Sequence, residues 1–253
     1  MTSQSARVSS ERPFYNLHAG AYDALITDPV EPWVQAVHQH LEGAGLKQAS
    51  ILDAGCGTGR HAQGLIDRGH RVTLLDASEP LLAIAQRRCP GSPAHHADIC
   101  LPGITGHFDA ITCRGVLNDL VEDDERVAAL EAFGARCRVD GFLFLDLREA
   151  RASRERADGQ ARQIEVTLDD GGCMLFTSRP TWSSGCIVVH ERYQLTLRDG
   201  TTNVHEYLFS MRPWEGREIE ARLDAAGFTD IQTRPGAGRR TPDRLLVTAR
   251  RTR

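Results

Sequence analysis

Apolar runs and amphipathic stretches alternate along the middle of the chain. The apolar runs lie at 50–53, 71–76, 94–97, 108–113 and 141–147, and segments with helical spacing lie between them at 60–68, 80–88 and 124–137. Strands that are apolar at every position are typical of a parallel sheet with helices on both faces. The pattern therefore predicts an α/β fold in which strands and helices alternate.

Two further helices are predicted before this alternation begins. Apolar residues recur at helical spacing over 14–27, Asp28-Pro29 interrupts the pattern, and a second helix is predicted over 31–41. We expect residues 13–45 to form a helical lid that closes over a substrate.

A period of two replaces the long apolar runs between 163 and 213. Here apolar and polar residues alternate, and turns rich in Asp, Ser and Gly separate the segments. This pattern predicts an antiparallel meander of three or four strands, inserted over 160–213. A helix over 215–226 and two short strands follow, so that 1–253 is predicted to be a single domain.

The composition narrows the range of partners. The chain has 253 residues, a hydrophobic fraction of 41% and a formal net charge of −4. A nucleic-acid-binding face usually needs a basic excess, and no apolar run approaches the ~18 residues that span a bilayer. The seven cysteines form no C-x-x-C pair, which argues against a disulfide framework and a thiolate zinc site. We expect a cytoplasmic protein that acts on a small molecule and binds no nucleic acid, membrane or metal.

One glycine-rich segment, 51-ILDAGCGTGRH-61, carries the candidate chemistry. An apolar strand ends in Asp53, and Gly55, Gly57 and Gly59 then lead into a helix. Glycine permits a sharp turn and lets a cofactor lie against the backbone. The helix N-terminus offers free N–H groups to a carboxylate. The segment therefore predicts a cofactor site.

A nicotinamide or flavin fingerprint is the alternative for this segment. That fingerprint is G-x-G-x-x-G, which would place a glycine where the chain has Arg60. A Tyr-x-x-x-Lys pair for hydride transfer cannot form either, because Lys47 is the sole lysine. Both observations disfavour an NAD-dependent oxidoreductase.

Two further acidic residues end strands beyond the glycine-rich segment. Asp76 ends the strand 71–76, where a carboxylate can accept both hydroxyls of a ribose. Asp98 follows the next strand, where a carboxylate can accept the amino group of adenine. The alternative for both residues is a role in a turn or a helix cap.

These motifs resemble those of the class I S-adenosylmethionine-dependent methyltransferases. The matching positions, which the resemblance implies bind the cofactor, are Tyr15, Asp53, Ala54, Gly55, Gly57, Gly59, Asp76, Ala77, Leu81, Asp98, Ile99, Cys113 and Arg114. The resemblance also implies a Rossmann-like sheet of seven strands with an antiparallel last strand. S-Adenosylmethionine is the implied cofactor, and S-adenosylhomocysteine is the implied product.

A narrower resemblance is to amino-sugar N,N-dimethyltransferases and glycine N-methyltransferases. It rests on the segment 14-FYNLHAGAYDAL-25 and on the antiparallel insertion. It implies methylation of a nitrogen or oxygen of a small molecule in specialised metabolism, such as antibiotic biosynthesis. The amino-sugar enzymes carry a histidine near the position of Asn118-Asp119, so this chain departs from their pattern there.

The catalytic and substrate-binding candidates lie at strand ends, in the lid and in the meander. Ligands bind at the carboxyl ends of parallel strands, and the sulfonium donor needs a base only if the acceptor is protonated. The catalytic candidates are Tyr22, Asn118 and Asp119, and the substrate-binding candidates are Tyr22, Arg148, His190 and His205. The alternatives are core packing for the tyrosines, helix capping for Asn118-Asp119 and ordinary sheet positions for the histidines. A non-catalytic S-adenosylmethionine-binding protein and a homo-oligomer also stay open.

A substitution of Asp76 tests the cofactor assignment. Asp76→Ala should weaken S-adenosylmethionine binding by roughly 1.5–3 kcal/mol, the scale of charge-assisted hydrogen bonds, and should leave the fold intact. Calorimetric titration measures this change directly. Unchanged affinity would show that Asp76 does not bind the ribose.

Overall fold

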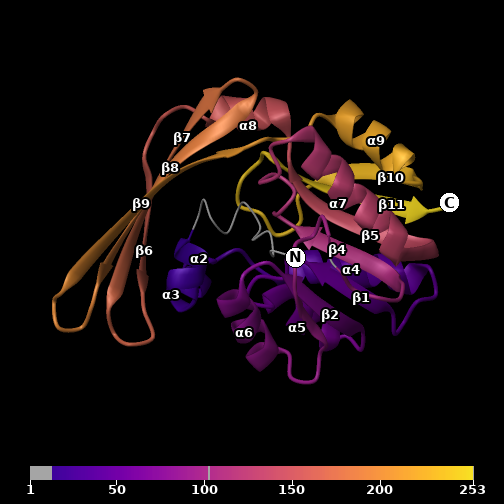
Figure 1. Cartoon of the computed structure of the whole chain (residues 1–253), viewed down its shortest axis with the longest axis horizontal. Coiled ribbons are helices and arrows are strands. Elements are labelled where there is room, and N and C mark those ends of the chain that lie inside the picture. Colours follow the sequence, from indigo (N-terminus) through magenta and orange to yellow (C-terminus); the bar gives the residue numbers. More distant parts are fainter. Residues whose placement is uncertain (1–12, 102, 253) are drawn as a thin grey trace.

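A sheet of seven strands forms the centre of the molecule (Figure 1). The computed structural model describes residues 13–101 and 103–252, so residues 1–12 of the predicted domain lie outside the described part. The strands follow the order β10-β11-β5-β4-β1-β2-β3. Their bounds are β1 Ser50–Ala54, β2 Arg71–Asp76, β3 Ala94–His96, β4 Phe108–Arg114, β5 Cys137–Arg148, β10 Phe228–Pro235 and β11 Arg244–Arg251. β11 pairs antiparallel with β5 and β10, whereas β3, β2, β1, β4 and β5 are parallel. The Rossmann-like sheet with an antiparallel last strand is confirmed.

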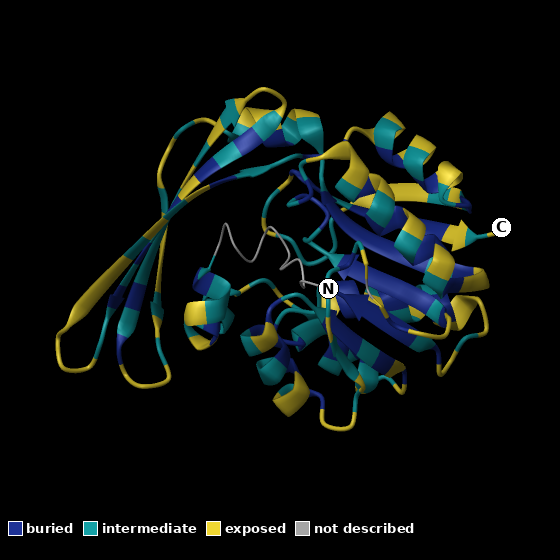
Figure 2. Ribbon diagram, in the orientation of Figure 1, coloured by how far each residue is buried: buried dark blue, intermediate teal, exposed yellow. Residues whose placement is uncertain are grey.

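Helices cover both faces of this sheet. Their bounds are α4 Glu31–Gly43, α5 Arg60–Ile66, α6 Glu79–Arg88, α7 Asp123–Arg136 and α9 Gly216–Ala225. One buried cluster joins α4, α5 and α6 to the sheet through Ile51, and a second joins α7 and α9 to it through Leu52. Successive residues of a strand point to opposite faces, so the fully apolar strands predicted from the sequence serve two cores. Figure 2 shows the central strands buried between these helices.

A second sheet of four antiparallel strands extends from the main body (Figure 1). It contains β6 Arg162–Thr167, β7 Cys173–Ser183, β8 Cys186–Thr196 and β9 Thr202–Met211, and the short helix α8 Ala150–Arg156 precedes it. The predicted meander is therefore present with four strands. Its hairpin ends are exposed (Figure 2).

The N-terminal segment differs from the single helix predicted over 14–27. It forms two short helices, α2 Phe14–Leu17 and α3 Ala19–Leu25, which are separated at His18 by a non-helical backbone with φ −137° and ψ 49°. From this position the His18 ring contacts His205 of β9, with 3.1 Å between the two Nε2 atoms. Phe14 stacks on Tyr193 of β8 at 3.6 Å between ring centroids. The interruption between α2 and α3 thus coincides with contacts to the second sheet. Helical periodicity in the sequence could not predict these contacts.

Helix α4 packs into the core and is not part of a cover over a cavity. Trp33, Val34 and Val37 have no exposed surface and belong to the cluster beneath the sheet. Within the described part of the N-terminal region, the residues that reach the cavity described below lie between 15 and 28.

A fully buried arginine joins α7 to α9. Nη1 of Arg126 lies 3.0 and 3.1 Å from the two carboxylate oxygens of Glu218, and Nε donates to the Leu120 carbonyl at 2.9 Å. The guanidinium carbon lies 3.9 Å from the centre of the Trp214 ring. Burial lowers the pKa of Arg126 to about 10, and the Glu218 charge opposes that change. Glu218 therefore compensates a cation that has no access to water.

Removal of Glu218 should destabilise the fold. Glu218→Ala leaves the Arg126 charge without its carboxylate, and breaking such a buried pair costs ~3–5 kcal/mol of unfolding free energy. Urea unfolding of the variant measures this loss. Glu220→Ala is the matched control, because Glu220 is exposed on the same helix. An equal effect of both substitutions would show that Arg126 does not depend on the pair.

Candidate active site

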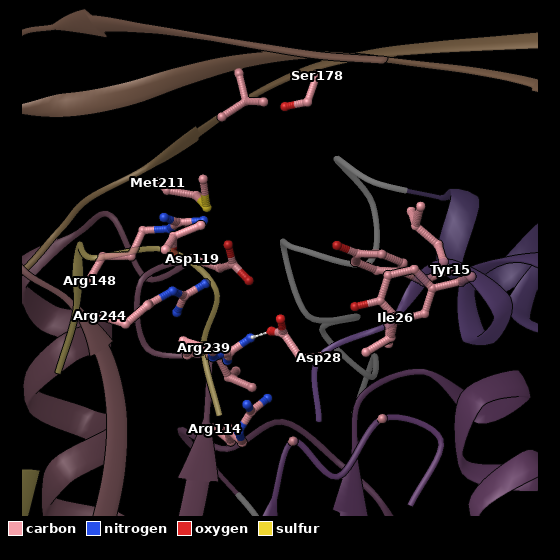
Figure 3. A pocket seen from close by; sticks show the side chains of 18 of the residues that line it. Tyr15, Ile26, Asp28, Arg114, Asp119, Arg148, Ser178, Met211, Arg239 and Arg244 are labelled. Carbon is pink, nitrogen blue, oxygen red and sulfur yellow. Dashed lines mark hydrogen bonds and ion pairs between the residues drawn. The ribbon is translucent and has the colours of Figure 1, made fainter. Parts of the chain in front are cut away.

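A cavity of about 610 Å³ opens at the carboxyl ends of the parallel strands. Three main parts of the described chain enclose it: the loops after the central strands, the N-terminal segment around α3, and the inner face of the β6–β9 sheet. Residues 153–157 and the loop 239–244 also line it. Figure 3 shows side chains from all three parts pointing into this space. The position agrees with the general location of ligand sites in open α/β sheets.

The glycine-rich segment forms the floor of the cavity. Gly57 has a φ of +55°, and a Cβ at this position would have no heavy atom within 4 Å, so its backbone is open to the cavity that it lines. Gly59 has a φ of +77°, and a Cβ there would lie 3.0 Å from the Cα of Ala85 in α6. Gly57 is therefore suited to a cofactor that approaches the backbone, whereas Gly59 permits helix packing.

Asp76 is oriented by backbone N–H groups on both sides. Its Oδ2 accepts from Gly57 N at 2.7 Å, and its Oδ1 accepts from Ser78 N at 2.8 Å. Each carboxylate oxygen has a second lone pair, so both oxygens can still accept a ribose hydroxyl. Burial raises the pKa of Asp76, and the two backbone hydrogen bonds oppose this rise. The described residues thus fit a bound ribose, and Asp76 also holds the glycine-rich segment in place.

Asp53 lies behind Asp76 and is nearly without solvent contact. It is 4% exposed, and its Oδ1 accepts from the Thr112 hydroxyl at 2.8 Å. Burial raises the pKa of the Asp53 carboxyl to about 6, and the nearby Asp76 charge raises it further against the effect of Thr112. The protein therefore holds two carboxyl groups close together at the cofactor end of the cavity.

Most of the predicted cofactor residues line the cavity together. These are Tyr15, Asp53, Gly55, Gly57, Asp76, Ala77, Leu81, Asp98, Ile99 and Arg114. Leu81 and Ile99 are 5% and 6% exposed, so they supply an apolar surface at the end where adenine would lie. Ala54 and Cys113 are fully buried in the core behind the cavity wall. Together with Gly59, these two residues support the site without lining it.

The predicted catalytic residues have different positions. Asp119 lines the cavity, and its carboxylate points inward on the same side as Arg148 and Arg244 (Figure 3). Asn118 is 1% exposed, and its side-chain oxygen accepts from the backbone N–H of Arg148 at 2.7 Å. Neither residue caps α7, because Glu122 forms the capping box of that helix.

The aromatic candidates are divided between the cavity and the second sheet. Tyr15 and Tyr22 both line the cavity and contact each other edge to face, with 4.4 Å between ring centroids. His205 contacts His18 in the interface between the lid and the sheet. His190 lies on the outer face of β8, 3.8 Å from Glu206, and is half-exposed. Neither histidine lines the cavity. The sequence could not show this, because alternation along a strand does not reveal which of its two faces is covered.

Arginines are the residues that the sequence pattern missed. Eight of the arginines that the structure describes line the cavity, namely Arg60, Arg114, Arg148, Arg156, Arg162, Arg239, Arg240 and Arg244. Only Arg114 and Arg148 were expected from their positions at strand ends. The available signal was the polar run 239-RRTPDR-244 between the two closing strands, which the topology places beside β5.

Comparisons with known proteins agree with this geometry. Residues 51–141 match the family described as "Methyltransferase domain". The chain is 39% identical over 101 residues to dTDP-3-amino-3,6-dideoxy-alpha-D-glucopyranose N,N-dimethyltransferase of Streptomyces fradiae, a match that covers 40% of each protein.

Two solved structures show the same fold over nearly the whole chain. DesVI of Streptomyces venezuelae has a TM-score of 0.80 at 19% identity, with 93% of this chain and 98% of that chain covered. CalS10 of Micromonospora echinaspora, an amino pentose methyltransferase solved with S-adenosylmethionine bound, has a TM-score of 0.73 at 25% identity, with 92% and 96% covered.

The sheet order, the glycine-rich floor and the matched domain define a class I S-adenosylmethionine-dependent methyltransferase. The chain shares the fold and the matched segment of this class, and S-adenosylmethionine is its cofactor. This finding replaces the alternative of an NAD-dependent oxidoreductase. No helix within the described residues is long and apolar enough to cross a membrane.

The pKa of Asp53 predicts a pH-dependent stability. An acid whose pKa rises from 3.8 to about 6 on folding contributes fully to stability at low pH and loses that contribution as the pH rises through 6. The difference corresponds to ~3 kcal/mol of unfolding free energy. Asp53→Asn, which does not ionise, should therefore gain stability relative to the wild type as the pH rises.

Urea unfolding between about pH 4.5 and about pH 7.5, without cofactor, measures this relative gain. Asp67→Asn is the control, because Asp67 is exposed. A constant difference between Asp53→Asn and the wild type would mean that Asp53 titrates normally.

Proposed function

We propose that this protein transfers the methyl group of S-adenosylmethionine to an amine nitrogen of a small molecule. The observation that carries the proposal is the Asp119 carboxylate, which points into the cavity after β4 (Figure 3). The amine acceptors named for relatives support nitrogen over oxygen. A role in specialised metabolism is part of the proposal and rests on the same relatives.

The bound cofactor supplies a methyl group on a positively charged sulfur, which is already activated for transfer. Asp119 would accept the proton that an ammonium group must lose before its nitrogen can attack. Tyr15 and Tyr22 would limit the positions open to the acceptor, because their two rings form one wall of the cavity. Positioning of this kind can lower the activation barrier by on the order of 7–11 kcal/mol.

Asn118 is proposed as a positioning residue and not as a catalytic residue. Its side chain accepts from Arg148 N, and its backbone carbonyl accepts from Arg212 N at 2.8 Å. These hydrogen bonds join the loop after β4 to the end of β5 and to the segment after β9. Asn118 would therefore fix the position of the neighbouring Asp119.

Cysteine state and net charge bear on the compartment and on the class of acceptor. All seven cysteines are free, which supports a reducing compartment such as the cytoplasm. The net charge of −4 supports a small-molecule acceptor over nucleic acid.

Asp119→Asn should lower kcat by about 10²–10⁴-fold, the usual contribution of a general base, without changing the affinity for S-adenosylhomocysteine. The assay measures S-adenosylhomocysteine release with a panel of amines and their hydroxyl analogues. Asp124→Asn is the control, because Asp124 is exposed at the start of α7.

Turnover of the hydroxyl analogues alone would contradict N-methylation. A cofactor-binding protein that turns over no compound of the panel would favour the non-catalytic alternative. Equal activity of Asp119→Asn and the wild type would remove Asp119 from the proposed mechanism.

A further inference from the structure

Two buried carboxylates orient four of the arginines that line the cavity. Asp243 is 0% exposed, and its carboxylate pairs with Arg148 and, at 3.3 Å, with Arg156 Nε. Asp146 is also 0% exposed and accepts from Arg244 at 2.8 Å and from Arg239 at 2.7 Å. The guanidinium groups are thus fixed before any ligand binds, which lowers the entropic cost of using them.

The charges on this wall are not balanced. Five guanidinium groups share this side of the cavity with four carboxylates, since Asp28 pairs with Arg239 at 2.9 Å and the Asp119 carboxylate lies on the same side (Figure 3). The fifth guanidinium is that of Arg114, whose Nη2 lies 3.5 and 3.3 Å from the backbone carbonyls of Ala237 and Gly238. Nε of Arg148 is buried and has no hydrogen-bond partner among the described residues. Burial lowers the pKa of Arg244 to about 9, and the charges of Arg148 and Arg239 lower it further. A negative charge placed here would relieve this repulsion.

The opposite wall of the cavity is largely apolar. It is formed by the inner face of the β6–β9 sheet, which contributes Ile164, Phe176, Pro180, Ile187, Val189 and Met211, and whose polar members are Arg162, Ser178 and Glu191. Ile187 and Val189 are 3% and 2% exposed. Figure 3 shows Ser178 across the cavity from Arg114, and Met211 beside Arg148 on the side that also carries Arg244. Hydroxyl groups against the apolar side chains would lose their hydrogen bonds to water without replacement.

We infer that the acceptor is an amphipathic anion, whose apolar body lies under the β6–β9 sheet and whose carboxylate or phosphate binds Arg148, Arg156 and Arg244. This inference rests on the proposed function, because it describes the acceptor of that reaction. The inferred acceptor differs from a hydroxyl-rich compound, which this cavity would accommodate less well. Guanidinium groups bind carboxylate and phosphate with the same planar donor geometry, so the two sources need separate probes.

Binding of three probes to the protein saturated with S-adenosylhomocysteine tests the inference. The probes are 2-naphthoate, 2-naphthyl phosphate and the neutral 2-naphthamide, and calorimetry or probe fluorescence reports their affinities. At least one anion should bind about tenfold more tightly than the amide, as expected for one charge-assisted hydrogen-bond pair. Preference for 2-naphthoate would identify a carboxylate acceptor, and preference for 2-naphthyl phosphate would identify a phosphate acceptor.

Matched variants show whether the arginine wall is responsible. Arg148→Gln and Arg156→Gln should each remove most of the preference for the anion, whereas Arg151→Gln should keep it. Arg151 lies on the same helix as Arg156, but its side chain is 88% exposed. Arg156→Gln keeps the test valid if Arg148→Gln unfolds, because Arg148 and Ser153 still contact Asp243 in that variant.

Equal affinity for the amide and both anions would overturn the inference, and so would an anion preference that survives both substitutions. These outcomes differ from failure of the proposed function. Loss of S-adenosylhomocysteine binding in the wild type would contradict the function itself, whereas cofactor binding without anion preference contradicts only the acceptor class.

Discussion

The fold depends on how the end of β1 is attached to the end of β2. Gly55 N and Cys56 N donate to the Leu75 carbonyl at 2.8 and 2.9 Å, and Gly57 N donates to the Asp76 carboxylate. These hydrogen bonds hold the backbone in a turn that residues with side chains rarely adopt. The two bonds to the Leu75 carbonyl fix the start of α5 against the sheet, and the bond from Gly57 N places the Asp76 carboxylate at the floor of the cavity. The packing of the sheet and the predicted cofactor site therefore share one constraint.

Sequence could predict this part of the molecule because its determinants are local. The strand ending in Asp53, the glycines and the strand ending in Asp76 lie within about 25 residues of one another. The apolar pattern of each strand and the glycines of the turn each indicate one local structure. The order of the strands also followed from their apolar character and from the resemblance. Most of the predicted cofactor residues consequently lie in one cavity.

The other part depends on contacts between distant segments. His18 leaves the helix where its ring meets His205, 187 residues away. Arg148 and Asp243 come together because β11 pairs antiparallel with β5. His190 and Glu191 are neighbours in β8, yet His190 is exposed and Glu191 is 7% exposed at the cavity. The alternation of residues along β8 shows that its two faces differ. Which face is covered depends on how α2 and α3 pack against the second sheet.

This division explains how the chain resembles its relatives. The family match covers 51–141, which contains the glycine-rich floor and the carboxylates predicted to bind the cofactor. The likeness to solved structures extends over nearly the whole chain at low identity. Most residues proposed to face the acceptor come from the lid, the second sheet and the segments 148–156 and 239–244, all outside the matched segment, whereas Asp119 lies within it. Since Phe14 and His18 join the lid to the second sheet, these parts form one wall. Its side chains can change while the cofactor site stays intact, so the acceptor must be inferred from the cavity of this chain.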